Sequence, residues 1–208
     1  MSKPFVFALA LDTLGAARVE SVIGVEPSGD PFNSIRLNAD NHPFNPMVNA
    51  GAIACSGLIH EAKGDAAFEY IRQALGRFAG RELDVDDAVF ASESTTGDRN
   101  RAIGYLLRTN AVIRDNVASV LDVYFRQCAI LVTARDIAVM AATLANGGIN
   151  PITGERAIRR EFVENILGVM TTCGMYDYAG EWVYWVGMPA KSGVAGGVIA
   201  VLPGQLGI

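Results

Sequence analysis

The chain has 208 residues, of which 50% are hydrophobic and 19% charged, and its formal net charge is −5. This composition supplies enough apolar material for a sizeable core and argues against disorder. The acidic balance, with no cluster of Lys or Arg, excludes the electrostatic footprint of a nucleic-acid-binding protein. Every apolar run is shorter than the roughly 20 residues that cross a bilayer, so no membrane partner is expected.

The first predicted element is an apolar helix that begins almost at the first residue. Pro4 is tolerated in a first helical turn, and residues 5–11 (FVFALAL) follow without a polar break. Asp12 and Thr13 come directly after this run and the helical pattern continues to Val22, which argues against a secretory signal peptide. We therefore expect a core helix here.

Helical periodicity dominates the next part of the chain. Apolar residues recur at helical spacing in residues 45–62, 65–79, 100–108, 117–130, 133–146 and 156–172. Thr133 and Asp136 form a predicted capping box at the start of one of these helices. Gly147 and Gly148 end that helix, and a turn at residues 150–154 (NPITG) follows it.

The pattern becomes extended only near the end of the chain. Residues 181–187 (EWVYWVG) and residues 197–202 (GVIAVL) are rich in β-branched and aromatic side chains, which predicts two strands. Pro203 and Gly204 predict a turn into a further strand that stays unfinished at Ile208.

Few side chains are suited to metals or disulfides. Cys55, Cys128 and Cys173 each lie in an apolar neighbourhood, so we expect buried thiols in a reducing compartment, and a reactive thiol is the alternative. His42 and His60 are the only histidines and fall in no metal-binding spacing. We expect no metal site and a cytoplasmic location.

Short polar islands between the apolar helices are where chemistry would be placed. In PFNPMVNAGAIA, Asn45 is placed to cap a helix, and the amide of Asn49 could bind a ligand or a neighbouring loop. Glu93 and Asn100, in SESTTGDRN, flank a predicted helix start and are either site residues or solvent-exposed side chains. Tyr124 lies at helical spacing in LDVYFRQC. It is either an aromatic residue of the core or part of a site.

The segment PAKSGVAGG exposes its backbone. Lys191, Ser192 and Gly193 open a strand of small residues, where a backbone N–H could bind an oxyanion. Serine β-lactamases and penicillin-binding proteins use a similar Lys-Thr-Gly strand beside an S-x-x-K helix. The alternative is a glycine-rich turn that carries a surface lysine.

Several blocks, in this order, resemble the serine-dependent, β-lactamase-like glutaminase family: NPMVNAGAI, ESTTGDRN with AIGY, VMAATLANGGINPITGE, CGMYD and PAKSGV. The resemblance covers nearly the whole chain from Lys3. It implies an α+β fold of the β-lactamase/penicillin-binding-protein type, in which a mostly helical lobe packs on a small antiparallel sheet that is incomplete here. We expect one glutaminase domain fragment over residues 1–208, mainly helical in residues 1–172 and sheet-forming in residues 181–208.

The resemblance also implies an activity, which is hydrolysis of L-glutamine to L-glutamate and ammonia through a serine acyl-enzyme in a homo-oligomer (dimer or tetramer), without metal or organic cofactor. It makes Lys3 or Tyr176 the group that takes the proton of the serine, and the backbone N–H of Val194 a catalytic oxyanion donor. With Glu93 as counter-ion of the α-ammonium group, it places in the glutamine pocket Asn49, Glu93, Asn100, Tyr124, Tyr176 and Val194.

The resemblance puts the nucleophilic serine one position before Met1, so we expect a fragment cut at both ends. Ser2 is a poor substitute, because adjacent helical residues are rotated by about 100° and point apart. We therefore expect this chain to hydrolyse glutamine weakly or not at all. Two alternatives stay open: a penicillin-recognising serine hydrolase, although the Ser-Asp-Asn triplet is absent, and a non-catalytic glutamine/glutamate-binding or oligomerisation fragment.

Overall fold

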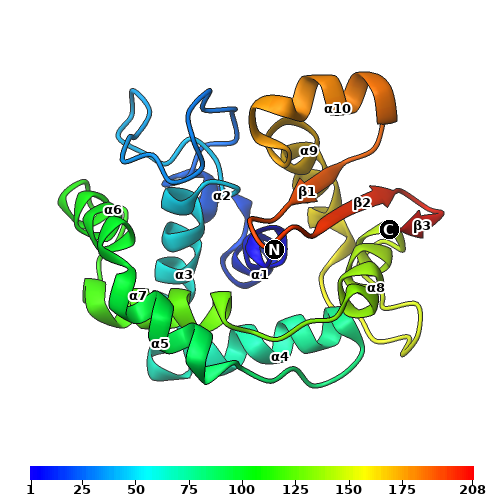
Figure 1. The fold of residues 1–208 in the computed structure, drawn as a ribbon, viewed down its shortest axis with the longest axis horizontal. Helices are drawn as coiled ribbons and strands as arrows, with labels where there is room; N and C mark the ends of the chain where they lie inside the picture. Colours follow the sequence, from blue (N-terminus) through cyan, green and yellow to red (C-terminus); the bar gives the residue numbers. More distant parts are fainter.

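The computed structural model describes residues 1–208 as a mostly helical fold with one small sheet (Figure 1). Its α-helices are α1 (Lys3–Leu14), α2 (Ala16–Glu20), α3 (Asn49–Lys63), α4 (Ala67–Ala79), α5 (Asp87–Thr96), α6 (Asp98–Thr109), α7 (Val117–Cys128), α8 (Ala134–Ala145), α9 (Val163–Cys173) and α10 (Ala179–Val186). Single 3₁₀ turns are η1 (Gly64–Ala66), η2 (Arg160–Phe162) and η3 (Tyr176–Tyr178), and the strands are β1 (Ala190–Ser192), β2 (Val198–Leu202) and β3 (Leu206–Gly207).

Helix α1 runs through the centre of the fold and packs against α3, α4 and α9 (Figure 1). Every residue from Pro4 to Leu11 is buried, as expected for a helix that is apolar on all sides. The predicted core helix is therefore confirmed. The helical pattern beyond it is interrupted at Gly15, which adopts φ = 81° and separates α1 from the short α2.

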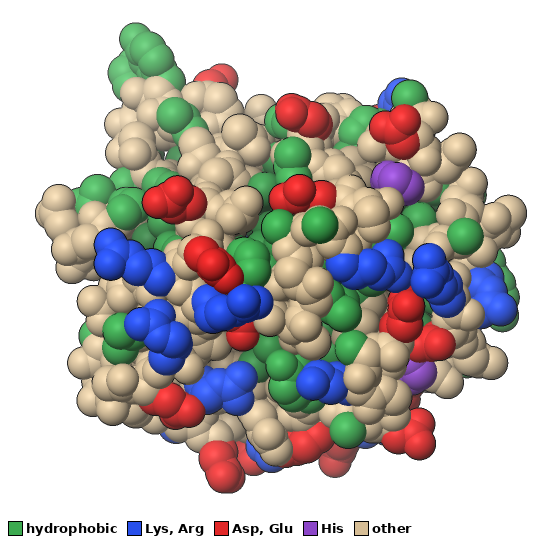
Figure 2. Space-filling view, turned by 180° about the vertical axis from the view of Figure 1, so that it is seen from behind, with side chains coloured by type: hydrophobic (Ala, Val, Ile, Leu, Met, Phe, Trp, Pro, Cys, Tyr) green, Lys and Arg blue, Asp and Glu red, His purple; other side chains and the backbone are tan.

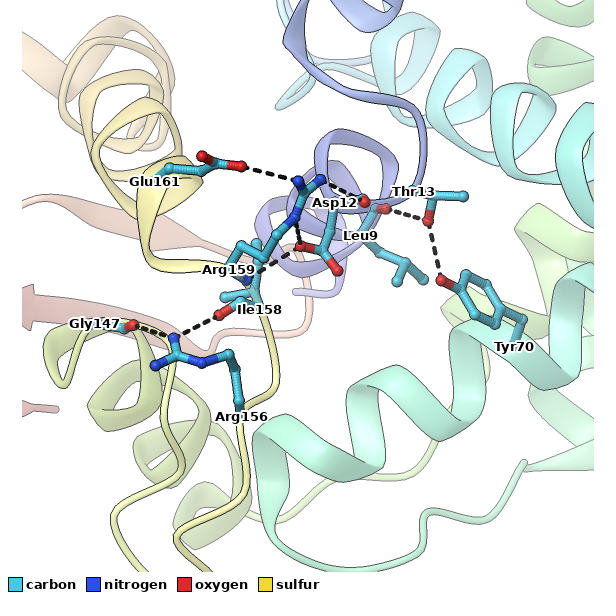
Figure 3. Close-up of polar contacts among 9 residues, drawn as sticks. All are labelled: Leu9, Asp12, Thr13, Tyr70, Gly147, Arg156, Ile158, Arg159 and Glu161. Atoms are coloured by element: carbon cyan, nitrogen blue, oxygen red, sulfur yellow. Dashed lines mark hydrogen bonds and ion pairs between the residues drawn. The ribbon is translucent and has the colours of Figure 1, made fainter.

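The end of α1 that lies far from Lys3 is held by polar contacts (Figure 3). The Arg159 guanidinium contacts the Asp12 carboxylate at 2.9 Å, donates to the Asp12 carbonyl at 2.8 Å and pairs with Glu161 at 2.9 Å. Thr13 donates to the Leu9 carbonyl and lies 3.1 Å from the Tyr70 hydroxyl of α4. These contacts fix the position of the helix on which Lys3 lies.

The sheet is antiparallel in the order β1-β2-β3 and packs against α8 and α9. Lys191 pairs with Ile199, and Leu202 pairs with Leu206 across the turn at Pro203 and Gly204. The predicted fold class, mostly helical with a small antiparallel sheet, is confirmed. The strand predicted at residues 197–202 and the turn after it are confirmed as well.

The strand predicted at residues 181–187 is wrong, because this segment is helix α10, and the sheet starts only at Ala190. The aromatic and β-branched composition suggested a half-buried strand, but Tyr184 and Trp185 are 78% and 72% exposed and pair with no strand. Gly187, left-handed at φ = 72°, ends the helix. In Figure 2 the end of α10 is the apolar projection at the upper left, on a face that carries many acidic and basic side chains.

Most of the other predicted helices are present, with shifted ends. The capping box of Thr133 and Asp136 is confirmed at the start of α8. Asn45 does not cap α3, because its Oδ1 accepts from Met47 N and its Nδ2 donates to the Glu26 carbonyl. Helix α5 was not predicted; Asp86 caps it by accepting from two backbone N–H groups.

The cysteine prediction is right for two residues and wrong for one. Cys55 and Cys173 are buried, but Cys128 is exposed at the last residue of α7. Helical periodicity places a residue on a face and does not reveal that the helix ends there. Among all the helices, none combines the length and the apolar character that crossing a membrane requires.

Candidate active site

The candidate site is built around the first residue of α1. The Lys3 ammonium donates to Asn49 Oδ1 at 2.8 Å, and Asn49 is the first residue of α3. In turn, Asn49 Nδ2 donates to Asn100 Oδ1 at 3.0 Å, and Asn100 lies in the first turn of α6. The starts of three helices are thus joined by a chain of three polar side chains.

The start of α3, where Asn49 lies, packs closely against two neighbouring backbone segments. A Cβ atom on Gly51 would lie 2.0 Å from the Asn45 carbonyl oxygen, so glycine lets the turn at Asn45 lie against the helix. The backbone N–H of Asn49 also donates to the Phe32 carbonyl at 2.7 Å. The small residues after Asn49 therefore serve the chain's own backbone.

Phe32 forms an aromatic wall beside these groups. Lys3 Nζ lies 5.4 Å from the centroid of the Phe32 ring, a distance at which the ring quadrupole stabilises the cation. The centroid of the Tyr176 ring lies 5.7 Å from that of Phe32. Phe32 thereby connects Lys3 with the second half of the site.

The second half contains Tyr176 and Lys191. Lys191 Nζ lies 2.9 Å from the Tyr176 hydroxyl, and it donates to the Gly174 carbonyl at 3.1 Å and to the carbonyl of Ser192. Only 1% of Lys191 is exposed. The alternative of a surface lysine in a glycine-rich turn is therefore wrong, because β1 inserts this side chain into the protein.

Tyr176 has an unusual backbone. Its φ is 54°, a left-handed conformation that bulky residues rarely adopt and that surrounding contacts must hold in place. Strain of this kind gathers at functional sites, which supports a role for the Tyr176 phenol.

Burial shifts the pKa values of these groups. Desolvation lowers the pKa of Lys3 to about 8, and desolvation together with the charge of Lys3 lowers that of Lys191 to about 7. Burial raises the pKa of the Tyr176 phenol to about 12. Near neutral pH Lys3 is therefore mostly charged, Lys191 is partly neutral and can accept a proton, and the Tyr176 phenol stays protonated.

Glu93 and Tyr124 lie next to one another in this region. Tyr124, on α7, is 3% exposed, and burial raises its pKa well above the usual value, with further contributions from Cys128, Glu93 and Tyr176. Glu93, on α5, is half-buried, and its carboxylate makes no hydrogen bond or ion pair within the chain. A negative charge is thus available to a ligand.

Val194 lies in the turn between β1 and β2. The residue is 81% exposed, and its backbone N–H has no acceptor within the chain. The same turn lies against the start of α1, because a Cβ atom on Gly193 would be 3.3 Å from Met1 Cε. The turn between β1 and β2, in which Val194 lies, is therefore close to the N-terminus and the start of α1 (Figure 1).

Ser2 does not contact Lys3. Its hydroxyl accepts from Gln127 Nε2 at 3.3 Å, and Gln127 Oε1 accepts from Ser56. Lys3 makes its hydrogen bond to Asn49, and no hydroxyl group contacts it. The geometry agrees with the expectation that adjacent residues on a helix point apart.

A cavity of about 320 Å³ borders the site at Tyr176. It is also lined by Ser28, Asp30, Asn45 and Cys173, and none of the other predicted site residues reaches it. This cavity therefore adjoins the polar cluster around Lys3 and does not contain it.

Sequence reasoning missed three residues of the site. Phe32 lies in a segment without periodicity, so nothing in the sequence marks it. Lys191 had a signal in the K-S-G triplet, but its burial depends on backbone carbonyls that carry no sequence signature. Gln127, fully buried beside Ser2, was a polar residue inside an apolar helix pattern, which is a usable signal.

The mostly helical fold with a small antiparallel sheet matches solved structures of the β-lactamase-like, serine-hydrolase-like type, and it places Lys3 at the start of a buried helix. The chain belongs to the glutaminase family, whose model matches residues 1–208.

Individual relatives agree with this assignment. Glutaminase 1 of Bradyrhizobium diazoefficiens is 76% identical over 208 residues, which are all of this chain and 34% of that protein. The solved structure of the probable glutaminase ybaS matches with a TM-score of 0.94 and 40% identity, over 99% of this chain and 67% of the other. Mglu in its glutamate form matches with a TM-score of 0.92 and 44% identity, over 99% and 48%. The chain spans between about a third and two thirds of the curated relatives it matches.

Proposed function

We propose that this protein hydrolyses L-glutamine to L-glutamate and ammonia through a serine acyl-enzyme, in glutamine catabolism. The observation that carries the proposal is that two groups have no hydrogen-bond partner within the chain: the Glu93 carboxylate, near Tyr124, and the Val194 N–H, in the turn that lies against the start of α1. A carboxylate suits the α-ammonium group of an amino acid, and a free N–H suits an oxyanion. Membership of the glutaminase family and a relative solved in a glutamate form support the same substrate.

Recognition of the amino-acid end of glutamine follows from the hydrogen-bond inventory. Asn49 uses its Oδ1 for Lys3 and its Nδ2 for Asn100 Oδ1, so Asn100 Nδ2 keeps two donor hydrogens for a ligand carboxylate. Glu93 binds the α-ammonium group, and the phenol of Tyr124 closes the pocket beside it. The α-ammonium group of the substrate thus meets a carboxylate, and its α-carboxylate meets a hydrogen-bond donor.

The chemical step uses Lys3, Tyr176 and Val194. The neutral fraction of Lys3, which its lowered pKa of about 8 enlarges, or the Tyr176 phenol takes the proton of the nucleophilic serine as its oxygen attacks the carboxamide carbon. The Val194 N–H stabilises the developing oxyanion, and removal of such a donor typically costs about 10²–10³ in kcat. Ammonia leaves with a proton, and water hydrolyses the acyl-enzyme.

We propose that these 208 residues alone turn over glutamine weakly, because no hydroxyl group contacts Lys3. The same observation favours one second function, the binding of glutamine or glutamate without catalysis. We also propose a cytoplasmic homo-oligomer, a dimer or tetramer; three unpaired cysteines are compatible with a reducing compartment. Light scattering of the purified chain tests the oligomer.

Calorimetry tests the substrate. L-Glutamate and L-glutamine should bind the 208-residue chain, and Glu93→Gln should weaken binding about 10- to 100-fold, the usual worth of a hydrogen bond to a charged group. Glu155→Gln is the matched control, because Glu155 is exposed and its side chain makes no contact. Equal affinities in the two variants would remove Glu93 from the site, and no binding of either ligand would refute the proposal.

An ammonia-release assay tests the chemistry. A chain extended to carry a serine three positions before Lys3 should turn over glutamine, and the 208-residue chain should be at least about 10³-fold slower, as for enzymes without their nucleophile. Neither should hydrolyse nitrocefin, which would instead indicate a penicillin-recognising hydrolase. Full turnover by the 208-residue chain would contradict the need for a serine three positions before Lys3.

A further inference from the structure

Lys191 is enclosed by three oxygen atoms. Two of them, the carbonyls of Gly174 and Ser192, are backbone acceptors, and the third is the Tyr176 hydroxyl at 2.9 Å. The residue is 1% exposed and is held in β1, opposite Ile199 of β2. Water therefore has little access to the amine.

These three partners suit both protonation states of the lysine. A carbonyl can only accept, whereas a hydroxyl can donate or accept. The ammonium form uses its three hydrogens for the three oxygens. The neutral amine uses two hydrogens for the carbonyls of Gly174 and Ser192, and its lone pair accepts from the Tyr176 hydroxyl. Lys191 can thus gain or lose a proton and keep every partner.

We propose that Lys191 is a positioning residue that exchanges a proton with Tyr176, so that its protonation decides whether the Tyr176 hydroxyl donates or accepts toward the site. This inference deepens the proposed function and rests on it. Lys191 acts through Tyr176 and does not touch the substrate.

The proton exchange explains how the Tyr176 phenol, which is protonated at pH 7, can accept the proton of the serine. Burial raises the pKa of Tyr176 to about 12, so at pH 7 only about one molecule in 10⁵ holds the phenolate needed for a direct base. With neutral Lys191 in contact, the phenol accepts the proton of the serine at Oη while its own proton moves to Lys191 Nζ. The phenol stays neutral, one N–H bond forms, and the electron pair of the serine oxygen forms the bond to carbon. The proton returns through Tyr176 to the leaving ammonia.

Neighbouring charges favour a neutral Lys191. The ionisable groups on the elements around it are the Met1 amine before α1, Lys3 and Asp12 on α1, Glu164 and Cys173 on α9, and Tyr176, Asp177 and Tyr178 on η3, with none on β2. Of these, Lys3 is the one whose charge shifts Lys191, and together with burial it lowers the pKa to about 7. A neutral amine is therefore well populated at physiological pH.

Nuclear magnetic resonance of the 208-residue chain tests the inference without any turnover. The chain has three lysines, Lys3, Lys63 and Lys191, so ¹⁵N-lysine labelling gives three side-chain signals, and exposed Lys63 is an internal reference. A ¹³Cζ-tyrosine label reports the Tyr176 hydroxyl, assigned with Tyr176→Phe. The Lys191 signal should titrate near pH 7, and the Tyr176 signal should show an inflection at the same midpoint.

Three variants separate the exchange from a structural role. Lys191→Met should remove the inflection of Tyr176 near pH 7, and Lys191→Arg, which keeps a charge but cannot release a proton, should remove it too. Lys63→Met should leave it unchanged. Circular dichroism shows whether each Lys191 variant is folded. If one is not, the wild-type midpoints and the effect of Tyr176→Phe on the Lys191 midpoint still test the exchange.

The titration experiment distinguishes a failure of the proton exchange from a failure of the proposed function. A Tyr176 signal without an inflection at the Lys191 midpoint, or one that persists in Lys191→Met, would overturn the exchange even if glutamine binds. Conversely, if Lys191 and Tyr176 titrate together but neither glutamine nor glutamate binds, the proposed function is refuted and the proton exchange between Lys191 and Tyr176 is not.

Discussion

Lys3 Nζ donates to Asn49 Oδ1 at 2.8 Å, and this single contact fixes the direction of the whole amide chain. An ammonium group has no lone pair to accept with, so the oxygen of Asn49 must face it. The nitrogen of Asn49 then faces Asn100 Oδ1, and Asn100 Nδ2 is left for a ligand. The contact with Lys3 thereby leaves the Asn100 amide nitrogen as the unpaired end of this chain.

Replacing Asn49 by aspartate should raise the pKa of Lys3. A carboxylate within hydrogen-bond distance favours the charged amine, typically by about 1 to 3 units, which opposes the desolvation that now lowers this pKa to about 8. The ¹⁵Nζ titration of Lys3 measures the change, and Asn165→Asp, exposed on α9, is the control. An unmoved Lys3 midpoint in Asn49→Asp would mean that the contact does not exist in solution.

Two glycines of the α9 region should respond in opposite ways to alanine. A Cβ atom on Gly174 would lie 1.8 Å from the Ala190 carbonyl oxygen, so β1 must move and Lys191 must lose its contact with Gly174. We expect a loss of about 2–4 kcal/mol. Gly168 has open space at this point and lies inside α9, so Gly168→Ala should stabilise by about 1 kcal/mol. Chemical denaturation measures both, and equal effects would contradict the packing described.

Asp136 contributes to stability through the start of α8. It accepts from Arg81 through both oxygens and from Thr133 in the capping box, and these partners, Arg81 foremost, hold its pKa below the usual value. Asp136→Asn should cost about 1–2 kcal/mol at pH 7.

The sign of the pH effect follows from that lowered pKa. The contribution of Asp136 is present above the unfolded value of about 4 and is lost as pH falls through the folded value. Wild type should therefore lose more stability on acidification than Asp136→Asn, measured by urea unfolding at several pH values. Asp40→Asn, exposed and without side-chain contacts, should behave as wild type, and parallel curves for Asp136→Asn would contradict the argument.

The sequence was sufficient where structure depends on local pattern. Helix α1 could be predicted because an apolar run can only be buried, and the start of α8 because Thr133 and Asp136 satisfy each other's backbone. The sequence was insufficient for α10, where Tyr184 and Trp185 have strand propensity but meet no partner strand. Propensity is decided by what packs against a segment, and that information is not local.

In the candidate site, too, the residues marked by a local sequence pattern could be predicted and those placed by long-range contacts could not. The types of Asn49, Glu93 and Asn100 mark them as polar residues in apolar surroundings, and the family resemblance places them together. Phe32 and the burial of Lys191 depend on contacts between segments far apart in the chain, such as Asn49 N with the Phe32 carbonyl. Such contacts leave no periodic signal in either segment.

The two site lysines should make stability rise with pH above neutrality. Their folded pKa values, about 8 for Lys3 and about 7 for Lys191, lie below the unfolded value of about 10.4, so between these limits the unfolded chain binds more protons and folding gains as pH rises. Each lysine contributes a slope of up to ~1.4 kcal/mol per pH unit. Just above pH 9 the trend should reverse, because burial raises the pKa values of four other groups, which ionise first in the unfolded chain: Cys55, Cys173, Tyr124 and Tyr176.

Urea unfolding between pH 6 and 10 measures this profile, with an expected maximum near pH 9. Lys191→Met should flatten the rise between pH 7 and 9, because only Lys3 and, below about pH 8, the Met1 amine still contribute to it. Lys63→Met should leave the rise unchanged, since Lys63 is exposed. A profile that falls steadily from pH 7, or a Lys191→Met curve parallel to wild type, would show that Lys191 is charged in the folded protein across this range. In that case the lone pair required for exchange with Tyr176 would be missing.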